Sequence, residues 1–473
     1  MVFSSSLFIF YFLPIFLIFY HFSKNVSYKN IVILLFSLLF YSWGAPYYVF
    51  VVVGFTIFDF YVVQFMHNQT NERRKRLLLM LSITTNLGLL AYFKYANFFV
   101  DNFNNLLMHI GFHAITWTKV VLPIGISFFT FQALTYSIDV YRKIHAPAKS
   151  VLQYLVFVTS FPQMIAGPIV RYTAVADQLP YREEKLDDKL IGVYRFCIGL
   201  AKKALIANVM AEQADAIFDG DLINLHAKEA WAGMLAYTFQ IYFDFSGYSD
   251  MAIGLAKMMG FHFPENFNSP YISKNISEFW RRWHITLGNF MRDYLYIPLG
   301  GNRVKSKSRL FFNLWLVFIL SGLWHGAAWN FVLWGAFHGL FLILDRLFLI
   351  KILNKLGSIF SILFTFIIVM FGWVIFRLEK MEDIVLYFKG LFNFETSSYE
   401  SSMEFKTILV IAFLFAFIAV SPIGKKLVVF FYEKENYSLK ANTLFMILSI
   451  VLLILSVSAI TSSGFNPFIY FRF

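Results

Sequence analysis

Two histidines stand out in this chain as groups that can do chemistry. His284 lies in FWRRWHITLGNFMRDYLYIPLGGNR (residues 279–303), and His325 lies in LSGLWHGAAWNFVLWG (residues 320–335), where small residues follow it. A neutral imidazole accepts a hydroxyl proton near pH 7, and burial favours its neutral form. The two residues therefore indicate base-assisted attack by an alcohol. The alternative for each is a hydrogen-bonded histidine that packs in the interior.

Three arginines share the segment of His284, namely Arg281, Arg282 and Arg292. An ion at the bilayer centre costs ~2.5–3.5 kcal/mol on insertion scales, so this group of charges predicts a cavity or a cytoplasmic interface. The arginines either set the topology of the chain or bind a donor.

No metal centre is expected. His284 and His325 are 41 residues apart, far beyond the spacing of a local metal site, and Cys197 is the only cysteine. A single cysteine supplies neither an intrachain disulfide nor a thiolate cluster. His338, in WGAFHGL, has weaker surroundings and is interpreted as structural.

Two carboxylates lie in YFDFSGYSDMAIGLAKMMGF (residues 242–261), an aromatic helix interrupted by glycine. Asp244 and Asp250 can orient a histidine, relay protons or hold helices together. Structural hydrogen bonding is the favoured interpretation for both.

The composition identifies the elements that must hold these residues. Of 473 residues, 59% are hydrophobic and 14% charged, and the mean hydropathy is +0.63. Ordinary globular chains have roughly 45–50% apolar and about 25% charged residues. The chain is therefore predicted to be an all-α polytopic membrane protein, which excludes a disordered chain, a secreted disulfide scaffold and a nucleic-acid-binding domain. The net charge of +12 is attributed to basic cytoplasmic loops.

Apolar stretches predict 11 to 13 transmembrane helices. They cover residues 2–22, 30–43, 47–66, 77–99, 119–140, 151–168, 229–258, 309–324, 328–350, 358–377, 405–422 and 441–461. The less apolar stretches 189–213 and 276–298 predict re-entrant or interfacial helices. The first stretch has no basic start and no cleavage site, so it is expected to be an uncleaved span. We expect one membrane domain over residues 1–461 and a tail over residues 462–473.

Basic loops set the expected orientation. The groups that are predicted to be cytoplasmic are Arg73 to Arg76, then Arg142, Lys143 and Lys149, then Arg303, Lys305, Lys307 and Arg309, and finally Lys425, Lys426 and Lys434. The acidic stretch 392–404 is expected outside. The last span then runs outward and leaves the C-terminal tail on the outer side.

The motifs, taken in order, resemble a known family. They are PIGISFFTFQALTYSIDVYR, FPQMIAGPIVR, YFDFSGYSDMAIGLAKMMGF, NFNSPYISKNISEFWRRWHITLGNFMRDYLYIPLGGNR and LSGLWHGAAWNFVLWGAFHGL. Together they are similar to the membrane-bound O-acyltransferases, and most similar to the branch that acetylates bacterial polysaccharides such as alginate or peptidoglycan. The resemblance implies a ring of tilted and re-entrant helices around a central tunnel. It makes His325 the catalytic residue and His284 its partner.

The resemblance also implies the substrates, the partner and the place of the protein. Acetyl is expected to come from a cytoplasmic thioester, acetyl-CoA, with Arg281, Arg282 and Arg292 as the donor-binding residues. An extracytoplasmic SGNH-type, esterase-like partner is expected to place the acetyl group on a polysaccharide. The protein is expected in the bacterial cytoplasmic (inner) membrane.

The last residues, FNPFIYFRF (465–473), have two interpretations. They can be an aromatic anchor at the outer interface. They also resemble the C-terminal tyrosine motif of extracellular acyl-transfer systems, which makes Tyr470 the residue that carries the acyl group.

Two other functions are disfavoured. A D-alanyl transferase of the same family is disfavoured by the fused tail, because the resemblance implies a separate small protein there. A proton-coupled transporter is disfavoured because the chain lacks inverted repeats of broken spans.

Overall fold

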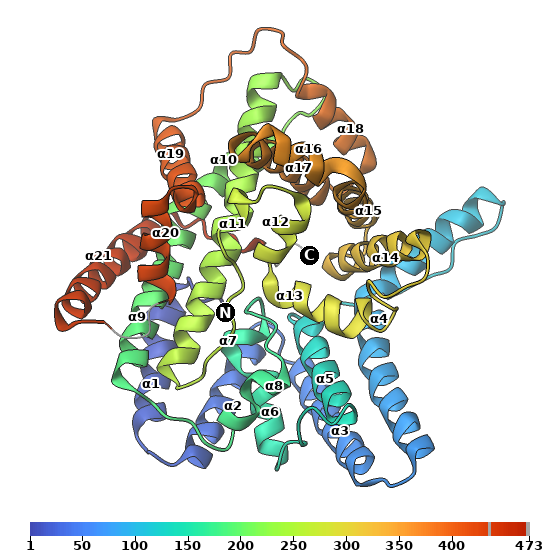
Figure 1. Ribbon diagram of the computed structural model, residues 1–473, viewed down its shortest axis with the longest axis vertical. Helices are drawn as coiled ribbons and strands as arrows, with labels where there is room; N and C mark the ends of the chain where they lie inside the picture. Colours follow the sequence, from blue (N-terminus) through green and yellow to red (C-terminus); the bar gives the residue numbers. More distant parts are fainter. Residues whose placement is uncertain (434–436, 470–473) are drawn as a thin grey trace. The chain divides into compact units, whose positions relative to one another are not determined.

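The computed structural model describes residues 1–433 and 437–469, and these ranges contain helices and no strand (Figure 1). The all-α class is thereby confirmed. The chain divides into two compact units. Unit 1 comprises Met1–Gly192 and Leu255–Pro264, and unit 2 comprises Val193–Gly254 and Glu265–Phe473. The single membrane domain over residues 1–461 stays a prediction.

Unit 1 holds the first helices. These are α1 (Leu13–His21) after a π-helical start at Phe8–Phe12, α2 (Val26–Ser42), α3 (Tyr48–Asn68), α4 (Glu72–His109), α5 (Ile126–Tyr141), α6 (Val151–Thr159), α7 (Phe161–Met164) and α8 (Tyr172–Val175). The predicted stretch 151–168 thus forms two short helices, because the first helix breaks at Ser160 and Pro162 lies in the first turn of α7.

A buried carboxylate ties the helices of unit 1 together. Asp59 of α3 accepts hydrogen bonds from Ser82 and Asn86 of α4 and from Tyr154 of α6. Its side chain is almost fully buried, and these donors replace the water that the carboxylate loses.

Unit 2 holds the remaining helices, apart from residues 255–258 at the end of one of them, which belong to unit 1. α9 (Leu186–Ala201) begins in unit 1 and continues through the π-helical segment η3 (Lys202–Ala207) into α10 (Asn208–Phe218). After these come α11 (Ala227–Met258), α12 (Ile276–Arg282), α13 (Ile285–Phe290), a π-helical turn at Met291–Tyr296, α14 (Lys307–His325), α15 (Trp329–Leu344), α16 (Ile350–Leu356), α17 (Ser358–Arg377), α18 (Met381–Gly390), α19 (Met403–Phe417), α20 (Pro422–Val428) and α21 (Leu439–Ser463).

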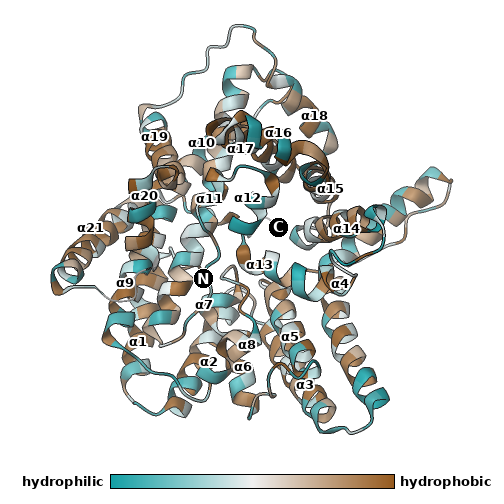
Figure 2. Ribbon diagram, viewed as in Figure 1, coloured by the Kyte–Doolittle hydropathy of each residue, from teal (hydrophilic) through white to brown (hydrophobic). Residues whose placement is uncertain are grey.

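Within residues 1–433 and 437–469, five helices are long and apolar enough to cross a membrane. They are Tyr48–Asn68, Glu72–His109, Ser358–Arg377, Met403–Val420 and Leu439–Ser463. Figure 2 shows hydrophobic residues along α19 and α21. These helices confirm that the chain is a multi-pass membrane protein, whereas the expected number of 11 to 13 spans stays a prediction.

Glycines bring α14 and α15 into backbone contact, side by side (Figure 1). A Cβ atom on Gly322 would lie 2.1 Å from the carbonyl oxygen of Phe331, and one on Gly335 would lie 2.4 Å from that of Phe318. Small residues allow helices in membranes to approach this closely. The turn between the two helices follows directly after His325, so their close packing fixes the end of α14.

A second glycine contact brings the helix before η3 against α11. A Cβ atom on Gly199 would lie 2.4 Å from the carbonyl oxygen of Gly247, and one on Gly247 would lie 2.7 Å from that of Gly199. Directly after Gly199 the chain widens into η3, and π-helical turns of this kind often mark functional sites. The crossing brings the lysines of η3 within reach of the carboxylates of α11.

The replacement Gly322→Ala is expected to lower the free energy of unfolding by about 1–3 kcal/mol, because the new methyl group meets backbone that must move. Gly88→Ala in α4 is the matched control, since a Cβ atom there meets nothing within 4 Å. Thermal unfolding of both purified variants in the same detergent measures the difference. Equal stability of the two variants would contradict the packing described for α14 and α15.

Candidate active site

His325 is the last residue of α14 and lies in an aromatic environment. Its imidazole ring is 4.9 Å from the ring of Trp324, 5.2 Å from that of Trp334 and 5.2 Å from that of Phe376, measured between centroids. The side chain is 8% exposed. Gly326 follows, where a Cβ atom would overlap the ring of Phe331. The small residue after His325 therefore admits an aromatic ring of α15.

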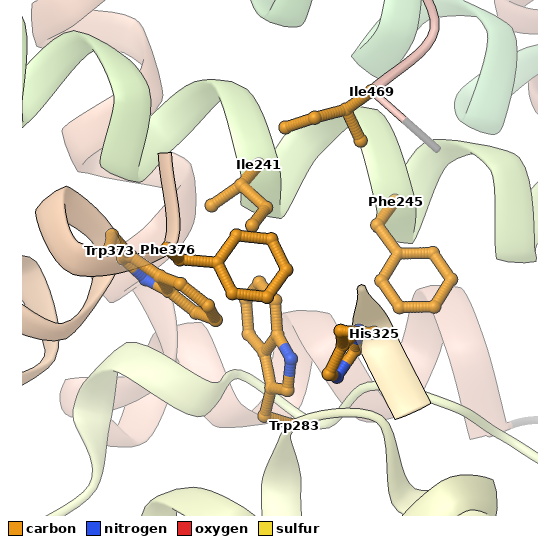
Figure 3. Close-up of a pocket in the computed structure, with 7 residues that line it drawn as sticks. All are labelled: Ile241, Phe245, Trp283, His325, Trp373, Phe376 and Ile469. Atoms are coloured by element: carbon orange, nitrogen blue, oxygen red, sulfur yellow. The ribbon is translucent and has the colours of Figure 1, made fainter. Parts of the chain in front are cut away.

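A small cavity opens at His325. The cavity is lined by His325 and by six other side chains. They are Ile241 and Phe245 of α11, Trp283 between α12 and α13, Trp373 and Phe376 of α17, and Ile469 of the C-terminal segment. Figure 3 shows these side chains grouped around the imidazole. The space is just about large enough for one water molecule. Among the described residues that line this cavity, His325 is the only titratable side chain.

His284 lies between α12 and α13 in a left-handed backbone conformation (φ 43°). Such a conformation is uncommon for a residue other than glycine and often marks a functional site. Its ring is 6.0 Å from that of Trp324, which in turn contacts His325. The structure therefore brings both predicted histidines next to the same indole.

Asn266 fixes the protonation of His284. Its side-chain oxygen accepts the N–H of Thr286 at 3.3 Å and the hydroxyl of Thr286 at 2.8 Å. The same oxygen lies 3.0 Å from Nδ1 of His284, so Nδ1 carries the proton and donates it. Nε2 therefore holds a lone pair, and it has no hydrogen-bond partner among the described residues.

Burial lowers the pKa of His284 to about 3, so the ring is neutral at pH 7. A neutral ring with its Nε2 lone pair unused can accept a hydrogen bond or a proton from a reacting group. The sequence does not indicate a role for Asn266, because this residue lies 18 residues before its partner His284, outside any local spacing rule.

The three predicted donor-binding arginines lie on α12 and the turn after α13, outside the lining of the His325 cavity. Arg282 donates to Glu278 at 3.0 Å and to the carbonyl oxygen of Asn268 at 3.1 Å. Arg292 forms two hydrogen bonds to Asp293. Arg281 is exposed. Their role in binding a donor stays a prediction.

The two carboxylates of α11 form ion pairs. Asp250 pairs with Arg195 at 2.8 Å and with Lys202 at 2.7 Å, and Arg195 also pairs with Glu265. Asp244 pairs with Lys203 at 2.8 Å. Both aspartates are thus paired with basic side chains, in keeping with the favoured interpretation as structural groups. His338 is fully buried in contact with Trp280 and Trp334, as a packing histidine is.

The C-terminal segment reaches the cavity. The main-chain N–H of Ile469 donates to Asp244 at 2.9 Å, and the side chain of Ile469 lines the cavity beside His325. Tyr470 itself lies outside the described residues. Its neighbour in the chain is nevertheless buried at the predicted catalytic histidine, a connection that the sequence did not reveal.

Known proteins match this chain over the region that contains these motifs. A family model described as MBOAT, membrane-bound O-acyltransferase family, matches residues 76–378. The chain belongs to the membrane-bound O-acyltransferase family. It is therefore an acyltransferase. The matched residues include both histidines and most of the cavity lining.

Three relatives in this family are similar over most of the chain. The probable alginate O-acetylase AlgI of Pseudomonas putida is 38% identical over 492 aligned positions that cover both chains completely. The protein of the same name from Pseudomonas aeruginosa is 43% identical over 84% of this chain and 76% of its own length. The peptidoglycan O-acetyltransferase of Helicobacter pylori is 38% identical over 83% of this chain and 80% of its own length.

The lowered pKa of His284 predicts a dependence of stability on pH. The unfolded chain, with an ordinary histidine pKa near 6.5, binds more protons than the folded chain between about pH 3 and 6.5. This group therefore reduces the stability of the fold as the pH falls through that range. His284→Gln should show a smaller loss of the unfolding midpoint between about pH 7 and 5 than the wild type. The same loss in both proteins would refute the burial of a neutral imidazole at this position.

Proposed function

We propose that the chain is an O-acetyltransferase that takes acetyl from acetyl-CoA on the cytoplasmic side and passes it to Tyr470. An extracytoplasmic, esterase-like partner of the SGNH type then removes the acetyl group from Tyr470 and places it on a polysaccharide such as alginate or peptidoglycan. The protein acts in the bacterial inner membrane, with its C-terminal tail on the outer side.

The burial of Ile469 beside His325 carries this proposal. Tyr470 is bonded to Ile469, and adjacent Cα atoms are about 3.8 Å apart across a trans peptide bond. A segment held in this way brings the residue that precedes Tyr470 to the cavity that contains the imidazole. The names of the relatives, which are alginate and peptidoglycan O-acetylating enzymes, support acetyl as the group and a polysaccharide as the acceptor.

The transfer needs one base. His325 takes the proton of the Tyr470 hydroxyl, and the phenolate oxygen attacks the thioester carbonyl of the donor. A C–O bond forms, the C–S bond breaks, and the coenzyme A thiolate receives the proton from His325. A proton transfer of this kind contributes about 10²–10⁴-fold to the rate. The covalent intermediate divides one transfer across the membrane into two simpler steps.

The aromatic lining of the cavity supports this chemistry. Trp283, Trp373 and Phe376 leave little room for water next to His325, so an acyl group there is protected from hydrolysis. His284, with its proton fixed on Nδ1, acts as the partner of His325. Its Nε2 orients a reacting group or relays a proton. The guanidinium groups of Arg281, Arg282 and Arg292 bind the phosphates of the donor on the cytoplasmic side.

Purified protein incubated with radiolabelled acetyl-CoA, in the absence of a partner, is expected to retain the label. Tyr470→Phe should abolish it because the accepting oxygen is gone, and His325→Ala should slow labelling by about 10²–10⁴-fold because the base is gone. Tyr11→Phe and His109→Ala, both exposed and remote along the chain, are the controls and should label as the wild type does. Label is counted on the protein band after electrophoresis.

Two results would contradict the proposal. Labelling that survives Tyr470→Phe would remove the tyrosine as carrier. Failure to label from acetyl-CoA, together with labelling from D-alanyl carrier protein, would replace acetyl transfer with D-alanyl transfer.

A further inference from the structure

Three polar side chains of unit 2 hold the main chain of the C-terminal segment. Lys203 donates to the carbonyl oxygen of Pro467, and Asp244 accepts the N–H of Ile469 at 2.9 Å. Asn208 donates to the carbonyl oxygen of Phe465 at 3.2 Å. The contacts thus recur at every second residue of the segment, as expected for an extended peptide bound along one side.

Lys203 and Asp244 are buried charges. Their side chains are 3% and 1% exposed, and they lie 2.8 Å apart. A buried ion pair needs further hydrogen bonds to make up for the water it has lost. The carbonyl oxygen of Pro467 and the N–H of Ile469 provide one such bond to each partner. Release of the segment therefore removes one hydrogen bond from each member of this buried pair.

Side chains of the segment then set its register. The ring of Phe468 stacks on that of Tyr248 with centroids 4.7 Å apart, and Ile469 enters the cavity of His325. Tyr248 is fully buried on α11, one turn after Asp244. The main-chain bonds fix the direction of the peptide, while the ring and the isoleucine fix which residue follows at the cavity.

We propose that Lys203, Asp244, Asn208 and Tyr248 form a peptide-docking site whose ligand is the chain's own segment 465–469. In this role they are positioning residues that hold Tyr470 at the catalytic histidine. The role in catalysis rests on the proposed function, whereas the docking of the segment does not.

The adjacent ion pair provides a matched control. Lys202, next to Lys203 in η3, pairs with Asp250 rather than with Asp244. Lys202→Met and Lys203→Met make the same chemical change at neighbouring positions of one helix. Only the second removes a donor to the C-terminal segment, so a difference between them reports on docking.

Hydrogen exchange measured by mass spectrometry on the full chain tests docking without any reaction. In the wild type the C-terminal peptide should exchange slowly. Lys203→Met and Asp244→Asn should increase its exchange by about tenfold or more, the effect of losing a hydrogen bond to a charged group. Lys202→Met should leave its exchange unchanged. Lys203→Arg, which keeps the charge, should restore most of the protection.

A variant within the segment itself distinguishes release of the segment from unfolding of the membrane helices. Phe468→Ala removes the ring that stacks on Tyr248 and changes no residue of the helices. It should increase exchange of the C-terminal peptide while the peptides of α11 and α21 exchange as in the wild type. Unchanged exchange of the tail in Asp244→Asn, Lys203→Met and Phe468→Ala would overturn the docking site.

Acetylation of Tyr470 gives the second measurement. The variants that release the segment should lower kcat for transfer from acetyl-CoA while KM for acetyl-CoA stays unchanged, because the donor does not contact the docking site. A raised KM with unchanged kcat would overturn the positioning role. Slow exchange in the wild type without acetylation of Tyr470 would leave the docking site standing and refute the proposed function instead.

Discussion

Asp244 and Lys203 place opposite charges in the interior of an apolar unit, and each must be surrounded by polar groups. Removal of one partner from such a pair costs about 3–5 kcal/mol, because the other charge stays buried without compensation. Helices satisfy their own main-chain groups, so the remaining hydrogen bonds come from the extended C-terminal segment. The position of the segment therefore follows from the charges, and the position of Ile469 at His325 follows from the segment.

Backbone contacts fix the other components of the site. The glycine crossing of Gly199 and Gly247 sets the distance between η3 and α11, and thus between Lys203 and Asp244. The pairing of α14 and α15 at Gly322 holds the helix end that carries His325. His284 is held by a side chain, Asn266, which fixes one ring nitrogen as a donor.

The sequence predicted what depends on local pattern. The apolar stretch 358–377 coincides with α17, and the small residue after His325 is indeed a point of close packing. The partners of the charged residues were not predictable, because they depend on where helices cross. Nothing in the sequence links Asp250 to Arg195, 55 residues earlier, or Asp244 to a main-chain N–H 225 residues later. At Lys202 the helix becomes π-helical, and two adjacent lysines pair with different aspartates. The composition of the segment does not predict this change.

We propose that the C-terminal segment presents Tyr470 to His325 as an acyl acceptor. Mass spectrometry of the C-terminal peptide after incubation of the purified protein with acetyl-CoA tests it most directly. The account predicts one acetyl group on the Tyr470 oxygen of the wild type and an unmodified peptide from His325→Ala. Acetyl on another residue of the wild type, with Tyr470 unmodified, would contradict it.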